Sequence, residues 1–192
     1  VLNGDSISGV TTMRLDKGMD TGDTYFSESV KIGENMTTGE LFDTLAEIGG
    51  KLLVQTVEGL ENGSAKPLPQ DHANATHADK ILPEECELDF SLPARAVHNR
   101  IRGLSPFPGT FSHLDGKIVK LYDSRLNDET GEKAPCGTVL EASRDGVVIA
   151  CGTGSVRLLS FKPEGKGILS AADMVNGRKI AAGMRFESVE NA

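Results

Sequence analysis

The chain has 192 residues, of which 38% are hydrophobic and 25% are charged, and its formal net charge at pH 7 is −8. This composition is that of an ordinary globular protein, and the acidity excludes a generally basic nucleic-acid binder. No stretch approaches the roughly 18 consecutive apolar residues of a membrane span, and no signal peptide is visible. We therefore predict a cytoplasmic protein that makes no membrane contact.

The sequence contains no pattern that is typical of a metal site or a disulfide framework. Cys86, Cys136 and Cys151 are odd in number, widely spaced and without CxxC spacing, so reduced thiols are expected. The four histidines have no ligand spacing with one another or with any cysteine, and each is interpreted as a surface or helix-face residue. They are His72, His77, His98 and His113.

Charge is distributed unevenly along the chain. Residues 1–82 hold 6 Lys/Arg against 13 Asp/Glu (6 − 13 = −7), and residues 83–192 hold 14 against 15 (14 − 15 = −1). Between 157 and 185, 6 basic residues accompany only 2 acidic ones (6 − 2 = +4). A local positive patch on an acidic protein can contact phosphates, although most such clusters are solvated surface. The candidate nucleic-acid-binding residues are Lys162, Lys166, Arg178 and Lys179.

The first elements suggest the closing part of an α/β domain. Alternating β-favouring residues predict strands at 9–15 and 24–32, and the loop from Asp16 to Asp23 joins them. A helix follows, because residues 37–40 have capping-box spacing and apolar residues then recur every three or four positions, up to the stop at Asn62-Gly63. That apolar stripe consists of Leu41, Leu45, Ile48 and Leu52, widened by Leu53, Val57 and Leu60.

A segment with no apolar periodicity separates these elements from the rest of the chain. Residues 63–83 are rich in Pro, Asp, Asn and His, which is typical of an interdomain connector on a surface. A short helix is then expected, with Ser91 as its cap and Pro93 in its first turn. Its apolar residues lie on one side: Ala94, Val97, Ile101 and Leu104.

After a Pro-Phe-Pro-Gly turn at 106–109 the sequence favours short strands separated by glycine-containing turns. The expected strands are 110–114, 117–126, 137–142, 147–151 and 155–161. About five short strands at this spacing fit a small OB-like barrel, which a helix at 171–176 closes. We thus expect an α/β part at 1–62, a linker at 63–83 and a β domain at 84–192.

The loop Asp16–Asp23 holds three carboxylates and two glycines in eight residues. A calcium loop needs Gly at its sixth position and Glu at its twelfth, where this sequence has Thr21 and Ser27. An aspartic protease would use two copies of Asp-Thr-Gly, and only one occurs here. Two interpretations remain: a loop that projects one carboxylate, Asp20, into a cleft for proton transfer, and an acidic turn without chemistry.

Four segments, taken in order, resemble the methionyl-tRNA formyltransferase family. Residues 4–11 resemble its G-D-x-x-T-G-V-T stretch, and residues 13–23 resemble its M-x-x-x-x-G-x-D-T-G-D loop. Residues 101–109 resemble I-R-A-x-N-P-x-P-G, with Phe107 where Trp is common, and residues 158–166 resemble L-L-x-L-Q-P-x-G-K, with Lys162 in place of Gln. The resemblance covers nearly all of residues 1–186.

The resemblance implies a Rossmann-like formyltransferase domain, of which this chain has the C-terminal remnant, followed by the OB-like barrel. The family moves a formyl group from 10-formyltetrahydrofolate to the amino group of methionyl initiator tRNA, using an Asn, a His and an Asp. Asp20 is the matching Asp, and the matching folate-binding loop is Asp16, Lys17, Gly18, Met19, Asp20 and Thr21. No metal is implied, and the full-length enzyme is expected to be a monomer.

The family's Asn and His lie in an N-x-H segment, and the 192 residues contain none. We therefore expect the chain to start after the first Rossmann strands and to be inactive alone. Two other functions stay open: a related formyltransferase acting on a nucleotide-sugar amine, and a non-catalytic RNA-binding barrel with a vestigial arm.

Overall fold

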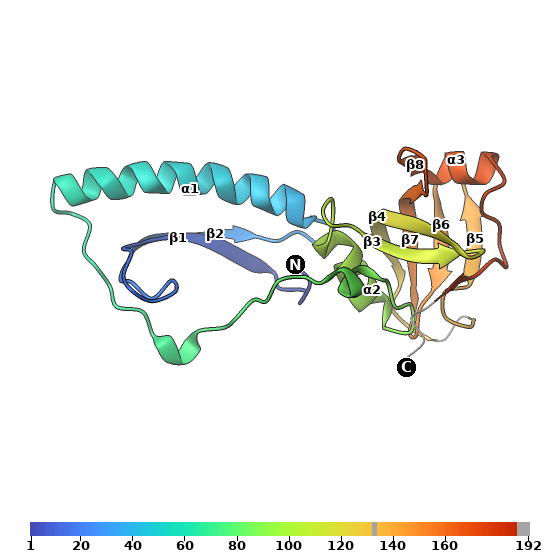
Figure 1. Ribbon diagram of the computed structural model, residues 1–192, viewed down its shortest axis with the longest axis horizontal. Coiled ribbons are helices and arrows are strands. Elements are labelled where there is room, and N and C mark those ends of the chain that lie inside the picture. The colour runs from blue at the N-terminus through green and yellow to red at the C-terminus, as the bar shows by residue number, and fades with distance from the viewer. Residues whose placement is uncertain (132–133, 188–192) are drawn as a thin grey trace. The chain divides into compact units, whose positions relative to one another are not determined.

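A computed structural model describes residues 1–131 and 134–187, and the chain divides into two compact units (Figure 1). The first, here called the hairpin unit, comprises Asp5–Glu34 and Glu40–Lys80. The second, here called the sheet unit, comprises Val1–Gly4, Asn35–Gly39 and the chain from Ile81 onward. Within the described residues, no helix is both long and apolar enough to cross a membrane.

The hairpin unit consists of two antiparallel strands with a long helix alongside them (Figure 1). Strand β1 is Ile7–Met13, β2 is Thr24–Lys31, and helix α1 is Thr38–Glu61. The hydroxyl groups of Thr12 and Thr56 lie 2.7 Å apart and join the first strand to the helix. The chain beyond the helix returns to the hairpin, where main-chain hydrogen bonds of 2.9 and 2.8 Å pair Thr24 with Leu68.

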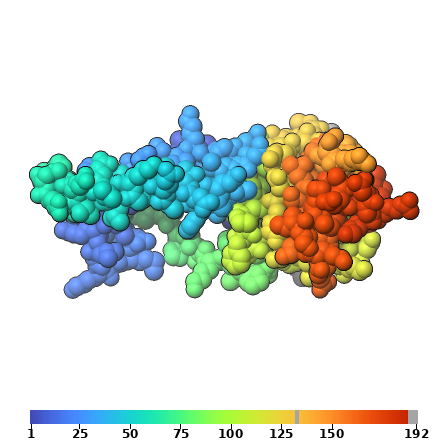
Figure 2. Space-filling view, turned by 90° about the horizontal axis from the view of Figure 1, so that it is seen from above, coloured from blue at the N-terminus to red at the C-terminus, as the bar shows by residue number. Residues whose placement is uncertain are grey.

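The apolar stripe of α1 is wider than the surface that covers it. Leu41 and Leu52 are buried, but Leu53, Val57 and Leu60 are each at least half exposed. Two strands are too narrow to cover a helix of 24 residues on more than one side, which explains why part of the predicted stripe faces outward. In Figure 2 the side chains of α1, in cyan, lie at the surface along its whole length.

The sheet unit is built on a curled antiparallel sheet. Among the described residues its strand order is β5-β6-β7-β4-β3-β9, with β8 paired to β7. The strands are β3 (Thr110–Leu114), β4 (Lys117–Asp128), β5 (Val139–Ser143), β6 (Gly146–Ala150), β7 (Ser155–Pro163), β8 (Leu169–Ser170) and β9 (Phe186–Glu187). Hydrogen bonds of 2.8 and 2.9 Å, from Val139 N to Met184 O and from Phe186 N to Gly137 O, bring the two edges of the sheet together.

Two helices pack on this sheet, α2 (Ala94–Gly103) and α3 (Ala171–Asn176). All four apolar residues expected on one side of α2 are buried, which confirms that prediction. The expected start of α2 was wrong, because its N-cap is Pro93 rather than Ser91. Residues 90–92 instead form a turn, and Gly152 N donates to the carbonyls of Phe90 and Leu92.

The core lies between the helices and the concave side of the sheet. Its largest fully buried side chains include Phe90, Phe161, Phe186, Leu121 and Leu158. The three cysteines are unpaired, and burial raises the pKa of the Cys151 thiol to about 12. This thiol therefore stays protonated and acts as a small apolar core residue.

Candidate functional site

The loop between β1 and β2, residues 14–23, is here called the acidic loop, and contacts between Arg14 and Asp23 close its base. Arg14 N donates to Asp23 O at 2.9 Å, and the guanidinium lies 2.9 Å from the Asp23 carboxylate. A side chain at position 22 would place its Cβ 1.7 Å from the carbonyl oxygen of Arg14, so only glycine fits there. The two ends of the loop are therefore fixed relative to each other.

The Asp16 side chain accepts hydrogen bonds that hold the first half of the acidic loop in its conformation. Its Oδ1 accepts hydrogen bonds from the Thr21 hydroxyl at 2.7 Å and from the Gly18 amide at 2.9 Å. The Thr21 hydroxyl, and then the Gly18 amide, hold the pKa of the Asp16 carboxyl below its ordinary value, because both donate to its charged form. The Asp16 carboxylate thus holds the loop together from within.

Asp20 lies at the tip of the acidic loop in the left-handed backbone conformation, with φ of 54°. The side-chain amide of Gln70 donates to the carbonyl oxygens of Asp20 and Gly22 at 2.8 and 2.7 Å, which holds the tip in place. The Asp20 side chain is exposed, and its carboxylate has no hydrogen-bond or ion-pair partner within residues 1–131 and 134–187. The geometry presents a carboxylate that is available to a ligand.

Gln70 was missed by the sequence reasoning. It belongs to the aperiodic segment 63–83, where neither spacing nor composition marks one side chain above another. The other side chains of the acidic loop are open to solvent: Lys17 is exposed, and Met19 and Leu15 are 82% and 86% exposed. No group of three or more His, Cys, Asp or Glu residues that could hold a metal ion exists in the described part of the chain.

The candidate phosphate-contacting residues lie in the sheet unit. Lys166, Arg178 and Lys179 line one groove of about 630 Å³, here called the basic groove, and Lys117 lines it as well. Its charged lining holds four basic residues against Asp115 and Glu164 (4 − 2 = +2). Lys162 is exposed on β7 but does not line this groove, so three of the four candidates come together. Residues beyond 155, orange to red, form much of the surface of the sheet unit that Figure 2 shows.

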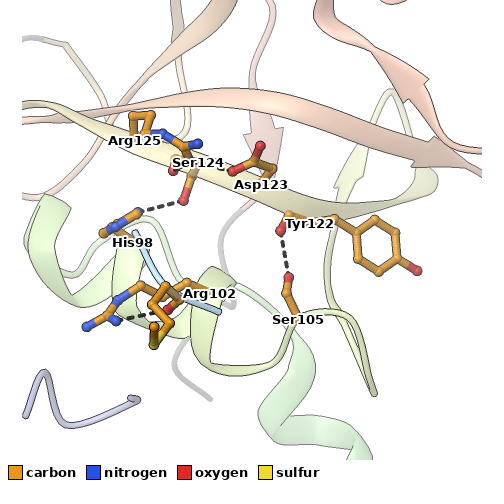
Figure 3. A network of polar contacts seen from close by, with 8 residues as sticks. His98, Arg102, Ser105, Tyr122, Asp123, Ser124 and Arg125 are labelled. Atoms are coloured by element: carbon orange, nitrogen blue, oxygen red, sulfur yellow. Dashed lines mark hydrogen bonds and ion pairs between the residues drawn. The ribbon is translucent and has the colours of Figure 1, made fainter. Parts of the chain in front are cut away.

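A buried polar layer between α2 and β4 holds the Pro-Phe-Pro-Gly turn (Figure 3). His98 Nδ1 lies 2.7 Å from the Ser124 hydroxyl, and both side chains are buried. The Ser105 hydroxyl donates to the carbonyl of Tyr122 at 2.6 Å, and Gly109 N donates to Leu104 O at 2.8 Å. The Ser105 bond anchors the start of the turn to β4, and the Gly109 bond joins its end to Leu104 at the C-cap of α2.

Two family profiles match the chain, formyl transferase over residues 1–57 and the formyl transferase C-terminal domain over residues 80–179. The chain belongs to the formyl transferase family. A curated relative, the methionyl-tRNA formyltransferase of Heliobacterium modesticaldum, is 39% identical over 97% of this chain. The chain spans 61% of that relative's length.

Solved structures share the fold at lower sequence identity. HypX from Aquifex aeolicus in complex with tetrahydrofolic acid is 22% identical with a TM-score of 0.67, over 91% of this chain and 31% of that one. An N-formyltransferase from Helicobacter canadensis, in complex with folinic acid and dTDP-3-aminofucose, is 20% identical with a TM-score of 0.65, over 82% of this chain and 57% of that one. The fold is thus a formyltransferase fold, with a mixed α/β part and a curled antiparallel sheet.

Proposed function

We propose that this chain carries part of the machinery that transfers a formyl group from 10-formyltetrahydrofolate to the amino group of methionyl initiator tRNA in translation initiation. The observation that carries the proposal is the exposed Asp20 carboxylate, which has no partner among the described residues, on an ordered loop of a chain of the formyl transferase family. The name of the 39% identical relative supports the choice of methionyl-tRNA as acceptor.

In this reaction the methionyl amine attacks the formyl carbon, a new C–N bond forms, and the bond between that carbon and N10 of the folate breaks. The amine loses a proton and N10 of the departing tetrahydrofolate gains one. Asp20 is the residue of this chain that we propose assists removal of the amine proton and orients a histidine partner. The family's Asn and His would stabilise the oxyanion. The 192 residues contain no N-x-H segment, so we expect no turnover by this chain alone.

We further propose that the acidic loop binds the folate co-substrate. We propose that residues 16–21 line the pterin ring, chiefly through main-chain groups, because residues 16–20 are all exposed to solvent. Met19, which is 82% exposed, offers an apolar surface next to the Asp20 carboxylate. A pterin has an apolar face and a polar edge, so these two neighbours suit it.

The proposed domain organisation assigns residues 1–62 to the C-terminal part of a Rossmann-like catalytic domain, 63–83 to a linker, and 84–192 to an OB-like tRNA-binding domain. The two compact units and the ranges of the two family profiles support a division of this kind. The joined edges of the curled sheet favour the OB-like assignment. The cytoplasmic location and the monomeric state stay predictions.

We propose that Lys162 and the basic groove contact tRNA phosphates. Changing Lys162 and Lys166 to Glu is expected to weaken tRNA binding and to lower the slope of log affinity against log salt by about one unit per lost phosphate contact. Lys66→Glu combined with Lys80→Glu, both on the hairpin unit, is the matched control because it makes the same charge change on two exposed lysines. Unchanged affinity of the double variant at low salt would contradict the assignment.

The acceptor can be tested in a chimera in which this chain replaces the matching 193 residues of the Heliobacterium relative. We expect the chimera to formylate methionyl initiator tRNA and to leave a nucleotide-sugar amine unmodified. Formylation of the sugar amine alone would favour the related sugar enzyme. A folded chimera that binds tRNA without formylating either acceptor would favour an RNA-binding barrel, and both results would overturn the proposal.

A further inference from the structure

A second groove of the sheet unit is apolar and adjoins the basic groove. Its volume is about 690 Å³, and its lining contains no acidic side chain. Phe107, Phe111 and Ile118 line it together with Ile81, Pro83 and Cys86. Among the described residues, Lys120 is the only charged one that lines it. We call it the aromatic groove.

Phe107 is held in an exposed position by its surroundings. Its side chain is 85% exposed, although it lies between Pro106 and Pro108 in the turn that Ser105 and Gly109 anchor. Exposure of a phenyl ring to water is unfavourable by itself. An ordered turn that exposes such a ring therefore offers its aromatic face for stacking by a ligand. Little conformational freedom would be lost when a flat ligand packs on it.

Cationic side chains flank the aromatic rings on the same face of the sheet. In the strand register Phe111 lies opposite Lys120, and Lys120 lies opposite Lys162, so the three residues form a row across β3, β4 and β7. Two lysines directly opposite each other repel. In the described part of the chain no carboxylate lies within ion-pair distance of either lysine, and Lys120 donates only to the Pro108 carbonyl at 3.3 Å. An anion bound between them would relieve this repulsion.

We propose that the aromatic groove binds unpaired nucleotides of an RNA. Bases stack on Phe107 and Phe111, and backbone phosphates bind Lys120 and Lys162, the combination that single-stranded nucleic acids require. Ile118 lines both this groove and the basic groove, so one RNA can continue from one into the other. The inference rests on the proposed function for its RNA partner. It goes further because lysines contact only the phosphates, whereas the aromatic groove would contact unpaired bases.

The test measures fluorescence anisotropy of a labelled single-stranded oligoadenylate titrated with the full chain. Phe107→Ala is expected to weaken binding at least about fivefold, and Phe107→Trp is expected to retain it, because stacking on an aromatic face carries the affinity. Phe42→Ala is the matched control, since Phe42 is 71% exposed but lies on the hairpin unit. Lys120→Gln and Lys162→Gln are each expected to lower the salt slope by about 0.7.

Equal affinity of Phe107→Ala and the unchanged chain would overturn the proposal, as would an equal loss in Phe42→Ala. A lower melting temperature of Phe107→Ala with unchanged oligoadenylate binding would show that the groove packs against protein, which also overturns it. A blunt-ended RNA duplex, which has no unpaired bases, should bind equally well to Phe107→Ala and to the unchanged chain. A loss with this duplex as large as the loss with oligoadenylate would overturn the assignment to unpaired bases. Binding of oligoadenylate does not require formylation, so the two proposals can fail separately. If oligoadenylate binding depends on Phe107 but the chimera formylates nothing, the proposed function is rejected and the assignment of the aromatic groove is retained.

Discussion

The two units of the chain are stabilised in different ways. The sheet unit has a continuous core in which Phe90, Phe161 and Phe186 are completely buried. The hairpin unit buries only a few side chains, such as Leu41 and Leu52, and leaves many large apolar residues of α1 and the acidic loop exposed. The loop that carries Asp20 nevertheless has a defined shape, which comes from hydrogen bonds made by the side chains of Asp16 and Gln70. A candidate site can therefore have a defined conformation without packing on a hydrophobic core.

The largest expected effect tests burial in the sheet unit. Phe161→Ala should lower the free energy of unfolding by about 3–5 kcal/mol, because it removes a completely buried ring and leaves a cavity. Leu53→Ala on α1 should change it by less than about 0.5 kcal/mol, since that side chain is 58% exposed. Urea unfolding followed by circular dichroism measures both. A comparable loss of unfolding free energy in the two variants would contradict the difference in burial between the two units.

A smaller effect is expected when the acidic loop loses its side-chain anchor. Gln70→Ala removes two hydrogen bonds to main-chain carbonyls and should lower the stability of the loop by about 1 kcal/mol. Amide hydrogen exchange at residues 16–23 should accelerate, while the sheet unit keeps its protection. Gln55→Ala, at an exposed position of α1, is the control and should leave the loop unchanged. Loop exchange that is equal in the two variants would refute the role of Gln70.

The smallest effect concerns the titration of Asp16. Because hydrogen bonds lower the pKa of this group in the folded chain, its contribution to stability is present above its unfolded value and is lost as the pH falls through its folded value. NMR titration of the Asp16 carboxyl should give a midpoint below 3.8. Thr21→Val removes the main donor and should raise that midpoint. A midpoint at or above 3.8 in the unchanged chain would contradict the hydrogen bonds described here.

Much of the sheet unit could be predicted from sequence because recognisable turn residues mark the ends of its strands and helices. Strand β3 and helix α3 were predicted with their observed bounds, since Gly109, Gly177 and an Asp-Gly turn mark their ends. Strands β8 and β9 have two residues each and were missed, because two residues cannot show a period. The exposed half of the α1 stripe illustrates a related limit: periodicity reveals an apolar face but not whether anything covers it.

The parts of the candidate site whose residues are neighbours in sequence could be predicted, and the parts that depend on tertiary contacts could not. The acidic loop stands out because its carboxylates and glycines are neighbours in sequence. The anchoring of its tip by Gln70, 50 positions away, depends on how the chain returns to the hairpin. Likewise Lys162 and Lys166 are close in sequence, yet only Lys166 lines the basic groove, because Lys162 belongs to β7 and Lys166 to the turn that follows it.

The most direct test of the central claim is the rate of methionyl-tRNA formylation by the Heliobacterium chimera carrying Asp20→Asn. The loss of an assisting carboxylate should lower kcat/KM by about 100-fold or more, because general acid–base groups contribute on that order. Asp43→Asn, an exposed carboxylate on α1, should leave the rate unchanged. A chimera with Asp20→Asn that folds normally and formylates methionyl-tRNA as fast as its parent would contradict the assignment of Asp20.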